Sequence, residues 1–551
     1  MQFNVTKFMT AFSSLITTRK VILILACVCL TVAPPLSPLA QSLDAATTPL
    51  NRADNIQLPT LGDGSEIRSS AERRLGDRIA REIYRDPDYV DDPVLSDYVQ
   101  RIWQPLLEAA RLRGDLTPEL QERFAWQLML IRDRTVNAFA LPGGYFGVHL
   151  GLLAVVGNRD ELASVLGHEL SHVTQRHIAR VMAKQSQQTP WMIGAMILGA
   201  LAAAKSPDAA NALIVGGQAA AIQNQLNFSR DMEREADRVG FGIMTQAGFE
   251  AHGFVSMFDK LQQASRLNDN GAYPYLRSHP LTTERIADMQ SRQPLGATGA
   301  SSAEPSIEHA MMMARARVLS NPGVDVLRAV ASENQGHAVA AATPARQAEV
   351  WYGATLASVR LREFQGARVQ LRRLLELVRA DPQATRLLRL LELEVELAAG
   401  DTERASALLR RLRSSSAQQG KAALMLRRPE LLLHAQIAAR ADNAVEAKQA
   451  AQDLQIWVLA HPQDMLAWQL LSGVYAAQGQ TLRAIRADAE AQAARLDYAA
   501  ALDRLRAAQA LVQDGVRTDA GKAVRDHIEA SIIDTRKRQL ESTLKEQTLD
   551  H

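Results

Sequence analysis

Two histidines four residues apart, His168 and His172, constrain the fold of this chain most, because they can act together only on a helix. Residues 168–172 read His-Glu-Leu-Ser-His. On an α-helix, positions i and i+4 lie on the same face, so both imidazoles can point at a single metal ion. The residues around the motif are apolar, namely Leu162, Val165, Leu166 and Val173. We therefore expect a buried helix inside a domain large enough to enclose it.

The glutamate inside this motif, Glu169, suggests the chemistry of the site. Zinc binds imidazole nitrogen readily, and a hydrolytic zinc site has three protein ligands and an open fourth position. Glu169 would take a proton from the attacking water and return it to the leaving amine. The motif therefore predicts hydrolysis of peptide bonds. The alternative is a chance match in a core helix.

A third ligand has to come from elsewhere in the chain. His177 follows His172 by five residues and would face about 140° away from it on a continuous helix. We therefore expect His177 to lie at the surface. A later helix offers Glu233 and Asp237, again at positions i and i+4. One of these carboxylates would bind the metal while the other holds a ligand histidine.

The later helix also carries small residues that favour close packing. Ala236 and Gly240 would let it approach the motif helix closely. Glu235 projects from a different face of the same helix, so we expect it not to bind the metal.

The first forty residues resemble a secretory leader. Lys7, Arg19 and Lys20 form a basic flank, and residues 21–33 are an apolar run. About thirteen apolar residues suit the core of a signal peptide and fall short of the roughly 20 that span a bilayer. We expect export and a mature chain that starts between about residues 41 and 47. An uncleaved membrane anchor is the alternative.

Charge and cysteine content exclude some classes of protein. The chain has 62 basic and 60 acidic residues, for a net charge of +2, and this balance does not suggest the concentrated basic face that binds nucleic acid. We therefore expect no nucleic-acid partner. Cys27 and Cys29 are the only cysteines, and both lie in the leader. Cysteine usage therefore cannot identify the compartment, and the prediction of export depends on the leader alone.

Around the motif, the pattern predicts both helices and strands. Residues 65–134 are expected to be mostly helical, and residues 136–141 and 145–148 are expected to form two short strands joined by Pro-Gly-Gly. Residues 191–204 are apolar and uncharged but too few to span a membrane. They would form a buried helix, a lid over the site or a peripheral membrane contact.

Helical patterns dominate beyond a small, polar linker at residues 293–305. Five residues follow the spacing of a tetratricopeptide repeat, namely Trp468, Leu471, Tyr475, Gly479 and Ala484. Pro429 and Pro462 lie 33 residues apart, close to the period of roughly 34 residues. We predict tetratricopeptide-like helical pairs over residues 306–545. An unrelated helical bundle is the alternative.

Together these motifs resemble a known family. His-Glu-x-x-His followed by Glu-x-x-Ala-Asp at residues 233–237 is similar to the HtpX-like and CAAX prenyl protease group of gluzincin metallopeptidases. Residues 137–144 resemble the edge strand that flanks the substrate in that group. With the leader, the Ser278-His279-Pro280 triplet and the helical tail, the chain is most similar to periplasmic members that carry a tetratricopeptide tail.

The resemblance implies a set of site residues. One zinc ion per chain would be bound by His168, His172 and Glu233, with Glu169 as the general base. Asp237 would then hold a ligand histidine from outside the metal shell.

Two further features are implied by the same resemblance. His279 would be a fourth zinc contact that holds the enzyme latent. The substrate backbone would pair with an edge strand made of Asn137, Ala138, Phe139 and Ala140.

We therefore predict an α+β architecture, with a signal peptide (1–40) and a mainly helical zinc metallopeptidase domain containing a small sheet (65–292). An all-α repeat domain would follow. The predicted function is a periplasmic endopeptidase, soluble or peripherally bound to the membrane, that degrades misassembled envelope proteins and assists outer-membrane assembly. Its tail would bind the outer-membrane assembly machinery. The alternative is a tetratricopeptide chaperone or scaffold of that machinery with a largely latent metal site.

Overall fold

The structure is a computed structural model that describes residues 68–184, 229–266, 272–293, 305–418, 427–441, 443–518 and 520–549. The expected signal peptide, the apolar run at 191–204 and most of the expected linker lie outside the described residues. Among the described helices, none is long and apolar enough to cross a membrane.

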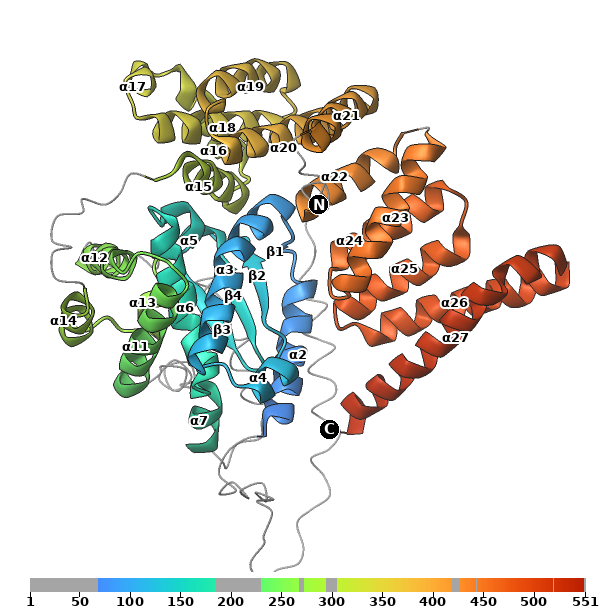
Figure 1. The fold of residues 1–551 in the computed structure, drawn as a ribbon, viewed down its shortest axis with the longest axis horizontal. Helices are drawn as coiled ribbons and strands as arrows, with labels where there is room; N and C mark the ends of the chain where they lie inside the picture. Colours follow the sequence, from blue (N-terminus) through green and yellow to red (C-terminus); the bar gives the residue numbers. More distant parts are fainter. Residues whose placement is uncertain are drawn as a thin grey trace, which may run out of the picture. The chain divides into compact units, whose positions relative to one another are not determined.

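A small mixed sheet forms the centre of the first half of the chain, with helices packed around it (Figure 1). Its strands are β1 (Tyr89–Val90), β2 (Gln127–Ile131), β3 (Ala138–Leu141) and β4 (Tyr145–His149). Their order is β1-β2-β4-β3, with β2 and β4 parallel and the outer pairs antiparallel. This order leaves β3 at one edge of the sheet.

The expected pair of strands after residue 135 is confirmed as β3 and β4. They are joined by a tight turn in which Gly143 and Gly144 have φ of 72° and 80°. Glycine adopts this left-handed region without the steric cost of a Cβ. A Cβ on Gly143 would also lie 2.7 Å from the Cα of Arg73. The turn therefore requires glycine at this position for both conformation and space.

The expectation of mostly helix up to residue 134 is confirmed by α2 (Ser69–Arg85), α3 (Pro93–Arg113) and α4 (Pro118–Arg123), but it did not include the short strands β1 and β2. The sequence of β2 is Gln-Leu-Met-Leu-Ile, and its last three residues are all buried. A short apolar run that is buried on both faces shows no alternation, so its periodicity does not distinguish a strand from a buried helix. Only pairing with β4 on one side and β1 on the other identifies it as a strand.

Ten helices surround the sheet in the described part of residues 68–293. They are α2 (Ser69–Arg85), α3 (Pro93–Arg113), α4 (Pro118–Arg123), α5 (Leu150–Val155), α6 (Arg159–Thr174), α7 (His177–Lys184), α11 (Arg230–Gln246), α12 (His252–Arg266), α13 (Tyr275–Ser278) and α14 (Thr283–Ser291). Helix α6 contains the motif and contacts α3, α11, α12 and β3. Its start is capped by the Asn158 side chain, whose oxygen accepts hydrogen bonds from two backbone amides of the first turn.

The described tail is entirely helical, as expected. Its helices are α15 (Ile307–Ser320), α16 (Val324–Ser332), the 3₁₀ turn η1 (Glu333–Gln335), α17 (His337–Ala340), α18 (Pro344–Arg360), α19 (Phe364–Val378), α20 (Pro382–Ala399), α21 (Thr402–Gln418), α22 (Arg428–Ala438), α23 (Ala444–Ala460), α24 (Met465–Ala477), α25 (Thr481–Ala494), α26 (Tyr498–Thr518) and α27 (Ala520–Leu549). Consecutive helices pack together, as in α18–α19 and α24–α25. The assignment to tetratricopeptide repeats stays a prediction.

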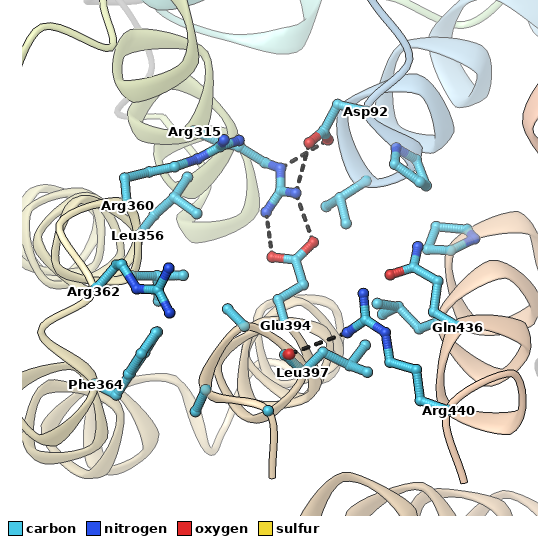
Figure 2. A pocket seen from close by; sticks show the side chains of 18 residues that line it. Asp92, Arg315, Leu356, Arg360, Arg362, Phe364, Glu394, Leu397, Gln436 and Arg440 are labelled. Carbon is cyan, nitrogen blue, oxygen red and sulfur yellow. Dashed lines mark hydrogen bonds and ion pairs between the residues drawn. The ribbon is translucent and has the colours of Figure 1, made fainter. Parts of the chain in front are cut away.

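An acidic corner at the start of α3, made of Asp91, Asp92 and Asp97, receives arginines from the tail. Asp92 caps α3 by accepting from the Leu95 amide at 2.8 Å. The three ion pairs are Arg315–Asp92 at 2.7 Å, Arg386–Asp97 at 2.9 Å and Arg428–Asp91 at 2.8 Å. Arg315 also pairs with Glu394 (Figure 2). Burial opposes ionisation of Asp92, but the Arg315 guanidinium holds the pKa of this carboxyl below its usual value.

Replacing Arg315 by alanine should destabilise the chain by about 3 kcal/mol, because it leaves the buried Asp92 carboxylate without its cation. The expected result is a lower midpoint of thermal unfolding, measured by circular dichroism. Arg328→Ala is the control, since Arg328 is 68% exposed and pairs with the fully exposed Asp325. Exposed pairs contribute about 0–1 kcal/mol. Equal midpoints for the two variants would contradict a stabilising role for Arg315.

Candidate metal centre

The motif helix α6 presents His168, Glu169 and His172 in the buried centre of the domain. Each of these residues is at most 2% exposed. The Nε2 atoms of the two histidines lie 3.0 Å apart. The i, i+4 spacing therefore directs two imidazole nitrogens at one point, as expected from the helical geometry.

Helix α11 brings a carboxylate to the same point. Gly240 on α11 lies against the backbone of Gly167 on α6, and a Cβ on Gly240 would be 2.9 Å from the Gly167 carbonyl carbon. The close approach expected at Gly240 is therefore confirmed. Across this contact, the Glu233 carboxylate lies 3.5 Å from Nε2 of His168 and 3.5 Å from Nε2 of His172.

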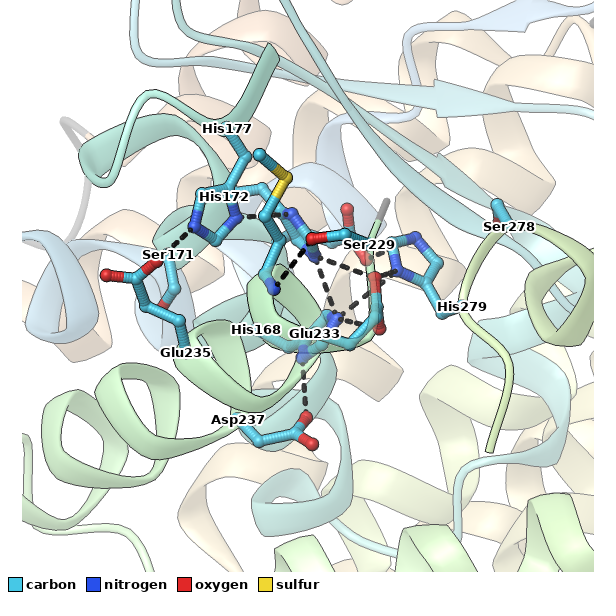
Figure 3. A network of polar contacts seen from close by, with 12 residues as sticks. His168, Ser171, His172, His177, Ser229, Glu233, Glu235, Asp237, Ser278 and His279 are labelled. Carbon is cyan, nitrogen blue, oxygen red and sulfur yellow. Dashed lines mark hydrogen bonds and ion pairs between the residues drawn. The ribbon is translucent and has the colours of Figure 1, made fainter. Parts of the chain in front are cut away.

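The loop after α13 adds a third imidazole, His279. Its Nδ1 lies 3.3 Å from Nε2 of His168 and 3.0 Å from a carboxylate oxygen of Glu233 (Figure 3). Its Nε2 lies 3.4 Å from an oxygen of Glu169. His279 is 3% exposed. The ring therefore lies between two of the candidate ligands and the candidate general base.

These four residues form a group that could hold a metal ion. One donor atom each from His168, His172, Glu233 and His279 lies within 4.8 Å of all the others. Imidazole nitrogens combined with one carboxylate oxygen are a donor set that suits zinc. Both carboxylate oxygens of Glu169 are buried and accept no well-aligned hydrogen bond in the described part of the chain, although His279 Nε2 lies 3.4 Å from one of them. A buried carboxylate that accepts no well-aligned hydrogen bond is costly unless a cation or a bound water offsets its charge.

A second layer of charged groups holds these side chains in place. Nδ1 of His168 lies 2.9 Å from Asp237, and the Arg285 guanidinium binds Asp237 at 2.6 and 2.7 Å. Arg285 also pairs with Glu233 at 2.9 Å. Such partners orient a ligand histidine and select its tautomer. The sequence does not identify Arg285, because a single arginine on a helix has no characteristic spacing.

The electrostatics of this region favour a cation. Burial opposes protonation of His168, but hydrogen bonds to Asp237 and Glu233 outweigh it and raise the pKa of His168 to about 9. Burial and the neighbouring His168 lower the pKa of His172 well below its ordinary value. A neutral imidazole is the form that binds a metal. Burial also raises the pKa of Glu169.

The expectation that His177 lies at the surface is wrong, because His177 is fully buried. The 100° rule assumes a continuous helix, but α6 ends at Thr174 and Arg176 has a positive φ of 53°. This break turns the chain back toward the motif. Nδ1 of His177 lies 3.0 Å from Nδ1 of His172, and its Nε2 lies 3.0 Å from Glu235.

The strand expected to pair with a substrate lies at the edge of the sheet. Ala138, Phe139 and Ala140 belong to β3, and Asn137 immediately precedes it. The ring of Phe139 lies over Gly147 of β4, where a Cβ would overlap it. On its outer side, β3 has no neighbouring strand among the described residues. This edge is next to α6, which contacts β3.

Comparison with known proteins agrees with this geometry. Residues 95–293 match the sequence model of a protein family described as "Peptidase family M48". This stretch contains all four members of the cluster. The expected resemblance to a metallopeptidase family is confirmed.

Curated relatives extend the comparison. A putative beta-barrel assembly-enhancing protease of Vibrio cholerae is 35% identical over 49% of this chain and 51% of the relative. The beta-barrel assembly-enhancing protease of Escherichia coli is 32% identical over 43% and 47%, respectively. The protein of the same name from Yersinia pestis is 27% identical over 79% and 84%. The match thus spans about half the length of the first two relatives and 84% of the length of the third.

Replacing His168 or Glu233 by alanine should remove a zinc ligand and weaken zinc binding by more than the roughly 10–100-fold that outer-shell partners contribute. Zinc per chain, measured by elemental analysis after dialysis, should fall from about one to a small fraction. The matched control is Asp231→Ala, in the same turn of α11 with its side chain 85% exposed. Full zinc content in Glu233→Ala would exclude Glu233 as a ligand.

Proposed function

We propose that this chain is a zinc-dependent endopeptidase. The observation that supports this most directly is the buried cluster of His168, His172, Glu233 and His279 with Glu169 beside it. The match of residues 95–293 to a peptidase family supports the same reaction class. The three ligands expected at a hydrolytic zinc site come from two helices that pack in direct contact.

The residues around the cluster suit hydrolysis of a peptide bond. Zinc, when bound, polarises the scissile carbonyl and makes the attacking water more acidic. Glu169 accepts a proton from that water and passes it to the leaving amine. Burial raises the pKa of Glu169, which brings its proton affinity closer to that needed in a general base at neutral pH. The β3 edge would hold the substrate backbone by adding it as a strand.

The proposed setting is the periplasm, and the proposed clients are misassembled outer-membrane proteins. The basic and apolar leader in the sequence supports export. The relatives named beta-barrel assembly-enhancing protease support a role in the envelope, and one of them aligns with 79% of this chain. We propose that this tail binds clients or the outer-membrane assembly machinery through helical repeats.

The central test is Glu169→Gln, which keeps the size of the side chain and removes the base. Cleavage of casein should fall by a factor of about 10²–10⁴ while bound zinc is unchanged. Zinc content and cleavage are measured on the same preparations of wild type and variant. A variant that still supports envelope assembly without cleaving would favour the chaperone or scaffold alternative.

His279 supports the proposal of a latent enzyme. Its ring occupies the space between His168, Glu233 and Glu169, where the attacking water would have to lie. A zinc site with this fourth protein ligand is closed, and activity would require His279 to move away. The fraction of molecules with His279 displaced would then limit the rate of cleavage.

Removing this side chain in His279→Ala should therefore raise cleavage while zinc is retained. The increase should equal the inverse of the displaced fraction in the wild type. Ser278→Ala, which changes only a hydroxyl bonded to the Tyr275 carbonyl, is the neighbouring control. Loss of cleavage with zinc retained would show that His279 acts in the reaction instead. Unchanged zinc and cleavage would leave it as a turn residue.

A further inference from the structure

We propose that His177 is a positioning residue that links the ligand histidine His172 to the carboxylate of Glu235. The inference rests on the proposed metal centre and extends it beyond the four clustered residues. Four side chains form the link in a fixed order: His172, His177, Glu235 and Arg180. Each contact along it is between 2.9 and 3.0 Å.

The direction of the hydrogen bonds follows from the role of His172. Its Nε2 faces His168 and Glu233, so this nitrogen keeps its lone pair for the metal. The proton of the neutral ring is then on Nδ1, which donates to Nδ1 of His177. His177 must therefore carry its own proton on Nε2, and this donates to Glu235. Arg180 donates to the same carboxylate oxygen of Glu235.

The other ligand histidine has an equivalent arrangement with one step fewer. Nδ1 of His168 contacts the Asp237 carboxylate directly, and Arg285 binds that carboxylate. Both ligand histidines thus end in a carboxylate that is paired with an arginine. Only the His172 branch inserts a second imidazole between ligand and carboxylate.

Local structure explains why the imidazole of His177 lies between His172 and Glu235. Glu235 is on α11 between Glu233 and Asp237, but it points to a different face, and its side chain is 28% exposed. It does not contact His172 in any hydrogen bond of the described structure. The break after α6 and the start of α7 at His177 place an imidazole between these two groups. His177 spans the gap from the buried ligand to the partly exposed carboxylate.

A ligand role for His177 itself does not fit the geometry. Its closest ring contact is with Nδ1 of His172, on the side of that ring opposite the metal-facing Nε2. It is absent from the group of donors that lie within 4.8 Å of one another. His177 therefore acts on the metal only through His172.

The expected effect is on metal affinity. Partners that orient a ligand histidine typically contribute 10–100-fold to metal binding. Two substitutions separate hydrogen bonding from volume. His177→Phe keeps a ring of similar size and loses both hydrogen bonds. His177→Gln offers an acceptor to His172 and a donor to Glu235 through one amide.

The test measures the zinc dissociation constant of the full chain by competition with a chelator. His177→Phe should raise this constant by about 10–100-fold, and His177→Gln should restore most of the affinity. Glu235→Ala should raise it less, because the imidazole contact is kept. His309→Ala is the matched control: His309 is a buried histidine that bonds to Tyr98 and to the Val156 carbonyl and is not a member of the cluster.

The outcomes separate a failure of the proposed zinc enzyme from a failure of the proposed role of His177. If wild type binds no zinc, the proposed function fails. If wild type binds one zinc and His177→Phe binds it equally well, this inference is overturned while the proposed function stands. If His177→Phe does not fold, Glu235→Ala decides, and an unchanged dissociation constant in that variant overturns the inference. A loss in His309→Ala equal to that in His177→Phe overturns it as well, because the effect would then be general destabilisation.

Discussion

The close contact between α6 and α11 is the constraint on which the candidate site depends. Gly167 and Gly240 meet backbone to backbone, and a Cβ on Gly240 would lie within 2.9 Å of the opposing chain. This distance allows the short Glu233 side chain to reach imidazoles on the other helix. A larger residue at either glycine would separate the helices and remove the carboxylate from the cluster. The chemistry therefore depends on a packing contact that makes no polar interaction with the site.

Charge balance gives a second constraint on the same region. Glu169, Glu233 and Asp237 are each at most 2% exposed, and Arg285 is the buried guanidinium that pairs with two of them. Three carboxylates and one guanidinium leave two negative charges, which one divalent cation would balance. Buried charges need such compensation, because their desolvation costs several kcal/mol each. The raised pKa of His168, which its hydrogen bonds to Asp237 and Glu233 produce against the effect of burial, is consistent with this excess of negative charge, since a proton reduces it as a cation would.

The sequence predicted those parts of the site that local geometry determines. The i, i+4 rule correctly placed His168 beside His172 on a helix, and the Pro-Gly-Gly turn correctly separated β3 from β4. Prediction from the sequence failed where the chain changes direction or where pairing with distant segments decides the secondary structure. Arg176 adopts a left-handed conformation that no helical projection includes, so His177 was misplaced. β2 is a strand only because β1 and β4 lie beside it, and Arg285 reaches the site only through the loop that follows α13.

Arg285 also links the candidate metal centre to the loop that carries His279. Its guanidinium donates to the Pro280 carbonyl at 2.8 Å while it binds Asp237 and Glu233. At the other end, the amide of Val136 donates to the Ala272 carbonyl at 2.8 Å, and the Tyr275 amide donates to the Val136 carbonyl.

The loop is therefore anchored on one side to the carboxylates of the site and on the other to the chain that enters β3. A peptide that pairs with β3 would bind next to the second anchor. The proposed movement of His279 away from the cluster would have to occur between these two anchors or break one of them. A substrate bound at the strand edge, as proposed above, would therefore lie beside one of the two contacts that hold the His279 loop in place.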